Sequence, residues 1–224
     1  KGINGFTAPI TSFSAVACIY PEVVQLVATA ASGIKSVEDL KGKMVGIGDV
    51  GSGTYYNAMQ ILEAAGIDAE NDIKTTPASF GDAAAGLKDG SIDAAFVTAG
   101  TPTTAITELA TATNVVAVDL GEDVIAKLMN DFPFYTKYEM TSADYGFITT
   151  PVNTVAIMAT YVVTNEMSED QAYEITKNLW EVEDVATCHA KAAQMDINTT
   201  VNGIGDVPLH PGAEKYYKEI GVIA

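Results

Sequence analysis

The stretch KMVGIGDVGSGTYYNAMQILEAAG, residues 43–66, decides the fold. Residues 43–48 predict a short strand, and the glycine-rich residues 51–54 predict a tight turn. In residues 55–65 the apolar side chains recur at helical spacing, and Gly66 is a good left-handed terminator. A strand, a turn and a helix in this order form the repeating unit of an α/β protein.

The same alternation continues on both sides of this stretch. Residues 19–28 form a β-branched, apolar run that predicts a buried strand despite Pro21, and Ser36 begins a capping box. Further strands are predicted at 73–78, 92–98 and 115–118, and further helices at 82–88, 101–112 and 122–130. Thr101 is predicted to cap the second of these helices, with Pro102 in its first turn. We therefore expect α/β architecture with a mainly parallel sheet flanked by helices.

The last part of the chain is predicted to be mostly helical. Residues 132–151 are rich in Tyr, Thr and Pro and are predicted to be irregular, and TVAIMATYVVT at 154–164 is the longest predicted strand. A second capping box, at Ser168 and Gln171, predicts helices from there to about residue 194. The apolar runs reach roughly half of the ~20 residues that span a bilayer, so no transmembrane helix is expected.

The charge balance restricts the partners. Twelve basic residues stand against 29 acidic ones, which gives a formal net charge of −17. Such a chain repels phosphate backbones, so we expect no nucleic-acid partner. All 12 cations are lysines. Because guanidinium is the best side chain for a bidentate grip on a carboxylate, an anionic ligand has to be held here by other groups.

The cysteines and histidines indicate neither a metal site nor a cofactor. Cys18 and Cys188 are too few and too far apart for a disulfide-rich scaffold or a zinc cluster. They could form one disulfide or remain two buried thiols, and the sequence leaves both alternatives open. His189 and His210 lack the carboxylate spacing of metal ligands, so we expect structural or surface roles. The chain starts without an initiator Met or a signal segment, and we expect its N-terminus to be truncated.

The glycine turn suggests a dinucleotide site, but one requirement is missing. Gly46, Gly48 and Gly51 match G-x-G-x-x-G between a strand and a helix. The fingerprint also needs an acidic residue at the end of the next strand. That strand ends in TPASF, residues 76–80, which contains none. A P-loop fails because Thr54 stands where lysine is needed, and a nucleophile elbow fails because the flanking glycines are not in place. An NAD-dependent α/β enzyme using the three glycines therefore stays the alternative, and no catalytic residue is predicted.

The favoured hypothesis for this turn is a carboxylate cradle. A small-residue turn before a helix presents free backbone N–H groups and hydroxyls at a positive helix end. A second small-residue turn follows the strand at 92–98, and α/β proteins bind ligands where strands end in this way. An ordinary capped turn explains the local pattern equally well. The ligand-binding residues predicted from the two turns are Gly51, Ser52, Gly53, Thr54, Thr98, Gly100 and Thr101.

Several segments resemble a known family. GIKSVEDLKGK at 33–43, followed by the glycine turn, resembles type II solute-binding proteins in general. More specific segments are YPEVVQLV (20–27), QILEAAG (60–66), PFYT (133–136) and LHPGAEKYY (209–217). Together, from about residue 17 to the C-terminus, they resemble the TAXI family, the extracytoplasmic solute receptors of TRAP transporters.

The resemblance implies a two-lobe type II periplasmic-binding-protein fold, or Venus flytrap. Such a receptor is not an enzyme: it closes as a monomer on a small organic acid or amino acid, typically glutamate or a dicarboxylate, and delivers it to the TRAP membrane permease. It works in the periplasm or otherwise outside the cytoplasm. Family members carry an opening βαβ segment that does not occur in this sequence, so the first lobe is expected to be incomplete. A sensor or antigen built on the same fold stays an alternative.

On this resemblance the lobes and the hinge can be assigned. Residues 1–33 and 152–224 would form the partial first lobe with the hinge strands, and residues 34–151 the second. Tyr20 is added as a ligand-binding residue in the hinge, although a strand-end aromatic in the core is an equal alternative. Tyr135 is a further ligand-binding candidate, for which a structural role is favoured. Glu22 and Gln25 are expected to stabilise the hinge, and Glu22 has the alternative of pairing with a ligand ammonium.

Overall fold

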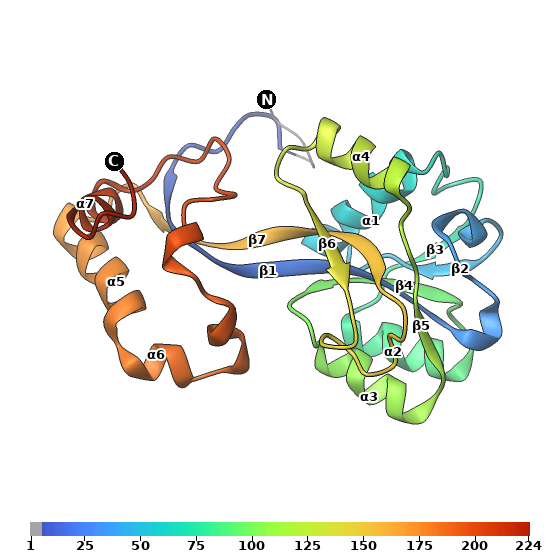
Figure 1. Ribbon diagram of the computed structural model, residues 1–224. Coiled ribbons are helices and arrows are strands. Elements are labelled where there is room, and N and C mark those ends of the chain that lie inside the picture. The colour runs from blue at the N-terminus through green and yellow to red at the C-terminus, as the bar shows by residue number, and fades with distance from the viewer. Residues whose placement is uncertain (1–5) are drawn as a thin grey trace. The chain divides into compact units, whose positions relative to one another are not determined.

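A computed structural model describes residues 6–224, apart from the side chains of Ala186 and Ala190 (Figure 1). The chain divides into two compact units: unit 1 is Lys1–Pro21, as far as it is described, with Met158–Ala224, and unit 2 is Glu22–Ile157. Strands β1 (Phe13–Thr29) and β7 (Val152–Thr164) each run through both units. That the units are the lobes of a binding protein stays a prediction.

Unit 2 is built on a mixed sheet. Its strands follow the order β3–β2–β4–β1–β7–β6, and β5 also pairs with β1. The bounds are Met44–Gly46 for β2, Lys74–Thr76 for β3, Ala94–Ala99 for β4, Val115–Ala117 for β5 and Thr136–Met140 for β6. Strand β2 is parallel to β3 and β4, whereas β1 is antiparallel to β4 and β5, and β6 to β7. The predicted α/β architecture is confirmed, but the sheet is mixed rather than mainly parallel.

Helices cover both faces of this sheet. The bounds are Gly53–Ala64 for α1, Phe80–Asp89 for α2, Thr104–Ala112 for α3 and Glu122–Asp131 for α4, with short 3-10 turns at Ala30–Ser32 and Val37–Leu40. On β1, Val24 and Leu26 join a core cluster with α1 and α4, whereas Val23 and Val27 join another with α2 and α3. Because side chains alternate along a strand, these clusters are the two faces of the sheet, and Figure 1 shows the helix pairs on its opposite sides.

Strand β6 corrects the prediction that residues 132–151 are irregular. It pairs with β7 in antiparallel register, with Thr136 opposite Ala156 and Met140 opposite Val152. Its sequence TKYEM contains one buried residue, Met140, so it lacks the apolar alternation that reveals a half-buried strand. The pairing with β7, rather than a local preference, makes this segment a strand.

Unit 1 has its own small core. Its helices are α5 (Glu169–Glu181), α6 (Glu183–Thr187) and α7 (Pro211–Glu219), with 3-10 turns at Ala190–Gln194 and Ile197–Thr199. Val16 and Val163, from the two long strands, pack with Tyr216 and Tyr217 of α7. At Gly212 the helices α5 and α7 approach so closely that an added Cβ would lie 2.1 Å from the Glu169 carbonyl oxygen.

The histidines and cysteines have ordinary structural surroundings. His210 caps α7, since its Nδ1 accepts from the Gly212 N–H at 3.3 Å and its Nε2 lies 3.1 Å from the Met167 carbonyl oxygen. The predicted structural role of His210 is therefore confirmed. Cys18 is buried and Cys188 is exposed, and both are free thiols. No helix formed by residues 6–224 has both the length and the apolar character to cross a bilayer.

Candidate functional site

The predicted cradle is the N-terminus of α1, which follows the carboxyl end of β2. Ser52 is the N-cap, and its Oγ accepts from the Tyr55 N–H at 3.1 Å. The Ser52 N–H donates in turn to the Asp49 carbonyl oxygen at 2.9 Å. The N–H groups of Gly53 and Thr54 find no acceptor within residues 6–224. Two donors therefore remain open at the positive end of the helix.

Glycines give this turn its shape and keep one side open. Gly48 has a φ of +79° and approaches the first turn of α1 so closely that an added Cβ would lie 2.8 Å from the Thr54 Cβ. By contrast, a Cβ added at Gly51 or at Gly53 would meet no atom of residues 6–224 within 4 Å beyond its own chain neighbours and helix backbone. Gly51 and Gly53 are also exposed. Backbone packing thus closes the turn at Gly48 and leaves it accessible at Gly51 and Gly53.

The structure brings Thr54 and Thr98 together, as expected for turns after neighbouring parallel strands. The Thr98 N–H donates to Thr54 Oγ1 at 3.2 Å, and the Thr98 hydroxyl donates to Asn57 Oδ1 at 3.0 Å. Both threonines are buried, with 5% and 9% of their surfaces exposed. Thr54 Oγ1 acts as an acceptor towards Thr98, and no group within residues 6–224 accepts the proton of its hydroxyl, so this proton is available as a donor. The Thr98 donors, however, are committed to protein groups.

The second predicted turn is held by protein contacts, and the prediction that Thr101 caps the following helix is wrong. The Thr101–Pro102 peptide is cis, and Thr103 rather than Thr101 is the N-cap of α3. Thr101 is 2% exposed, and its hydroxyl donates to the Asp144 carboxylate. The Gly100 carbonyl oxygen accepts from the Thr103 hydroxyl at 3.1 Å. The Thr101 hydroxyl therefore helps to fix the turn, and its part in ligand binding stays a prediction.

Residues that the sequence reasoning did not connect with the site hold this second turn. Gln25 is fully buried on β1, and its Nε2 donates to the Ala99 carbonyl oxygen at 3.0 Å and to Thr103 Oγ1 at 3.1 Å. The Tyr145 hydroxyl donates to Gln25 Oε1 and accepts from the Thr103 N–H at 2.7 Å. The sequence did contain a signal for this contact: Gln25 lies within the apolar run YPEVVQLV, and a buried side-chain amide needs several hydrogen-bond partners.

Burial shifts the ionisation of groups around these turns. Burial raises the pKa of Tyr135 to about 12, against a smaller lowering by the hydrogen bond from Asn57. Burial likewise raises the pKa of Tyr145 and the pKa of Glu22 above their ordinary values. Both tyrosines are therefore neutral hydrogen-bonding groups at neutral pH.

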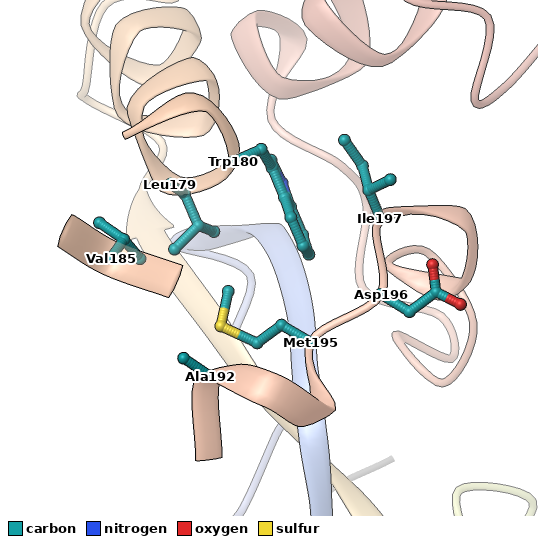
Figure 2. A pocket seen from close by; sticks show the side chains of 7 residues that line it. All are labelled: Leu179, Trp180, Val185, Ala192, Met195, Asp196 and Ile197. Carbon is teal, nitrogen blue, oxygen red and sulfur yellow. The ribbon is translucent and has the colours of Figure 1, made fainter. Parts of the chain in front are cut away.

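Tyr20 belongs to unit 1 and lines a pocket within that unit. This pocket has a volume of about 370 Å³ and also contains Cys188, His189 and Lys191 in its wall. A second pocket of about 300 Å³ is shown in Figure 2, and its lining residues are Leu179, Trp180, Val185, Ala192, Met195, Asp196 and Ile197. The two pockets share three apolar wall residues. A role of Tyr20 in ligand binding stays a prediction.

The surroundings of the three motif glycines do not favour a dinucleotide site. Strand β3 ends at Thr76 and is followed by Pro77, Ala78 and Ser79, so no carboxylate stands where a ribose would need one. Ser79 caps α2 through the Asp82 N–H at 3.2 Å. Within residues 6–224, His, Cys, Asp and Glu side chains form no group of three that could hold a metal ion.

The chain belongs to the NMT1-like family, whose family model matches residues 1–221. Among solved structures it is similar to the periplasmic aliphatic sulphonate binding protein SsuA from Escherichia coli, with 16% identity and a TM-score of 0.45 over 83% of this chain and 56% of that chain. It is also similar to MatC from Rhodopseudomonas palustris with bound malate, with 15% identity and a TM-score of 0.47 over 93% of this chain and 67% of that chain.

A third similar structure is the alkanesulfonate-binding protein SsuA from Xanthomonas axonopodis pv. citri bound to MOPS, with 15% identity and a TM-score of 0.43 over 92% of this chain and 59% of that chain. The chain thus spans less than two thirds of the length of either SsuA protein. Membership of the more specific TAXI family stays a prediction.

Proposed function

We propose that this protein is the solute-binding receptor of a TRAP-type transporter, working outside the cytoplasm. It captures a small carboxylate at the N-terminus of α1 and delivers it to a membrane permease. The observation that carries the proposal is the pair of unoccupied N–H groups at Gly53 and Thr54, next to the free proton of the Thr54 hydroxyl. The membership of the NMT1-like family is consistent with this function.

The donor set supports the proposed class of ligand. The open groups of the cradle, which are two N–H groups and the hydroxyls of Ser52 and Thr54, offer protons to a ligand. Such a set favours an anion over a cation, and a carboxylate oxygen over an amine. Because the sequence contains no arginine, no guanidinium competes with these groups for a bidentate grip on the ligand. Glutamate and dicarboxylates are the leading candidates, as the resemblance to the TAXI family implies.

The two compact units supply the parts for closure on the solute. We propose that units 1 and 2 act as the lobes of the receptor, with β1 and β7 as hinge strands, and that Tyr20 contributes from unit 1. Strands shared by two units are suitable hinges, because small changes of backbone dihedrals within them move one unit against the other. The receptor acts as a monomer that docks on its permease.

The test is to identify the solute and then remove one donor. Native mass spectrometry of the purified protein is expected to show a co-purified small acid. Calorimetric titration with L-glutamate, L-malate, succinate and ethanesulfonate then ranks the candidates, and titration with NAD tests the alternative. Thr54→Ala is expected to weaken carboxylate binding by at least about tenfold, since a hydrogen bond to a charged group contributes about 1.5–3 kcal/mol. Binding of NAD, or unchanged affinity in Thr54→Ala, would refute the proposal.

A further inference from the structure

Helix α1 carries a stripe of polar residues on a buried face. Thr54, Asn57 and Gln60 are spaced three residues apart and lie on one side of the helix, with 5%, 5% and 8% of their surfaces exposed. Apolar residues are the usual choice for such a face. The partners of the stripe are Thr98, at the end of β4, and Tyr135, directly before β6.

The stripe is part of one continuous chain of hydrogen bonds. The Thr98 N–H donates to Thr54 Oγ1, and the Thr98 hydroxyl donates to Asn57 Oδ1. Asn57 Nδ2 donates to the Tyr135 hydroxyl oxygen at 2.6 Å, and the Tyr135 hydroxyl donates to Gln60 Oε1 at 2.6 Å. Tyr135 is 2% exposed, so its phenol is reserved for these two contacts. This series of hydrogen bonds connects the first turn of α1 with the end of β4.

Stability alone does not explain this network. Well-packed apolar side chains of similar size are often as stabilising as a buried polar network, because they avoid the cost of removing polar groups from water. A fully satisfied network, however, fixes one relative position of its members, since every displacement leaves a buried group unpaired. The network on α1 therefore specifies where Thr54 lies relative to Thr98.

We propose that Tyr135 is a positioning residue for the α1 N-terminus and makes that turn selective for anions. Through Asn57 and Thr98, the phenol holds the Thr98 N–H against Thr54 Oγ1, so that the Thr54 hydroxyl offers its proton to a ligand. The turn then presents donors towards a ligand, which bind a carboxylate better than the neutral amide of the same shape. This inference rests on the proposed function of the turn.

The test compares Tyr135→Phe with the wild-type protein and with Thr176→Val. The control removes another buried hydroxyl, on α5 of unit 1, which donates to the Ala172 carbonyl oxygen at 2.7 Å and belongs neither to the network nor to the hinge strands. Sodium acetate and acetamide serve as the charged and neutral probes, and the amide resonances of Gly53 and Thr54 report binding. Hydrogen exchange of the Thr98 amide reports its bond to Thr54 without any ligand.

Tyr135→Phe is expected to speed Thr98 amide exchange and to weaken acetate about three- to tenfold, while acetamide changes little. Thr176→Val is expected to match the wild type in both readouts. Should Tyr135→Phe fail to fold, Gln60→Met, which loses one contact at the far end of the chain, is expected to show the same trend. Wild-type exchange and wild-type acetate binding in Tyr135→Phe or Gln60→Met overturn the positioning role. If acetate does not shift the Gly53 and Thr54 amide resonances of the wild-type protein, the proposed function is refuted instead.

Discussion

Replacing Ser52 with aspartate should separate ligand binding from helix stability. Aspartate caps a helix about as well as serine, and a negative charge at a helix N-terminus contributes about 0.3–1 kcal/mol of stability. Ser52→Asp is therefore expected to leave the thermal midpoint unchanged or slightly raised. The same carboxylate stands beside the open N–H groups of Gly53 and Thr54, where the ligand carboxylate is expected to bind.

The size of the binding loss follows from the position of the new charge. Two like charges about 4 Å apart repel by about 4 kcal/mol at an effective dielectric constant of about 20. Ser52 is half-buried rather than enclosed, so solvent and salt reduce this repulsion. A remaining penalty of about 1.4 kcal/mol would already weaken the ligand tenfold. We expect a loss of at least that size.

Ser52→Gly is the matched control for this substitution. Glycine as an N-cap costs only a few tenths of a kcal/mol, and it removes one hydroxyl donor without adding charge. Calorimetric titration with the carboxylate that the wild type binds best, together with thermal unfolding followed by circular dichroism, gives both quantities. The expected order of affinity is wild type, Ser52→Gly, Ser52→Asp. Wild-type affinity in a stable Ser52→Asp protein would place the ligand away from α1 and refute the reasoning.

Three further predictions concern stability and are checked by chemical or thermal unfolding. Gly48→Ala is expected to cost about 1–3 kcal/mol, because φ is +79° and the new Cβ would lie 2.8 Å from the Thr54 Cβ. Gly212→Ala is expected to cost at least about 3 kcal/mol and to affect unit 1 first, because its Cβ would lie 2.1 Å from the Glu169 carbonyl oxygen. Burial raises the pKa of Glu22 above its ordinary value of 4.5, so ionisation of this carboxyl opposes folding. Glu22→Gln is therefore expected to raise the thermal midpoint at neutral pH, and this gain is expected to disappear well below pH 4.5, where Glu22 is protonated in both states.

Local signals made most of the secondary structure predictable. The capping boxes at Ser36 and Ser168 are both present, because the contact between a cap residue and the third helical residue depends on adjacent sequence alone. The N-terminus of α1 followed in the same way from the glycine turn and the apolar spacing after it. The nearness of the Thr54 hydroxyl to Thr98 was also predictable, because the neighbouring parallel strands β2 and β4 end at the same edge of the sheet.

Features that depend on distant partners were not predictable. The direction of β1 against β4 is a matter of pairing, and a single strand sequence does not encode it. The N-cap of α3 is Thr103, two residues after the expected position, because the Thr101 hydroxyl is bonded to the distant Asp144. The polar stripe on α1 was visible as a three-residue spacing, but its meaning required Tyr135, which lies 75 residues beyond Gln60.

The charge of the protein explains why such a network matters for the proposed function. A net charge of −17 repels an approaching anion, and salt screens this repulsion beyond about 8 Å at physiological ionic strength. Attraction must then come from contacts of hydrogen-bond length. Without guanidinium, each donor of the cradle contributes about 1.5–3 kcal/mol towards a charged ligand, and only when it is well aligned. Such donors therefore have to be held in the right orientation towards the ligand. The buried hydrogen-bond network from Tyr135 to Thr54 provides this orientation.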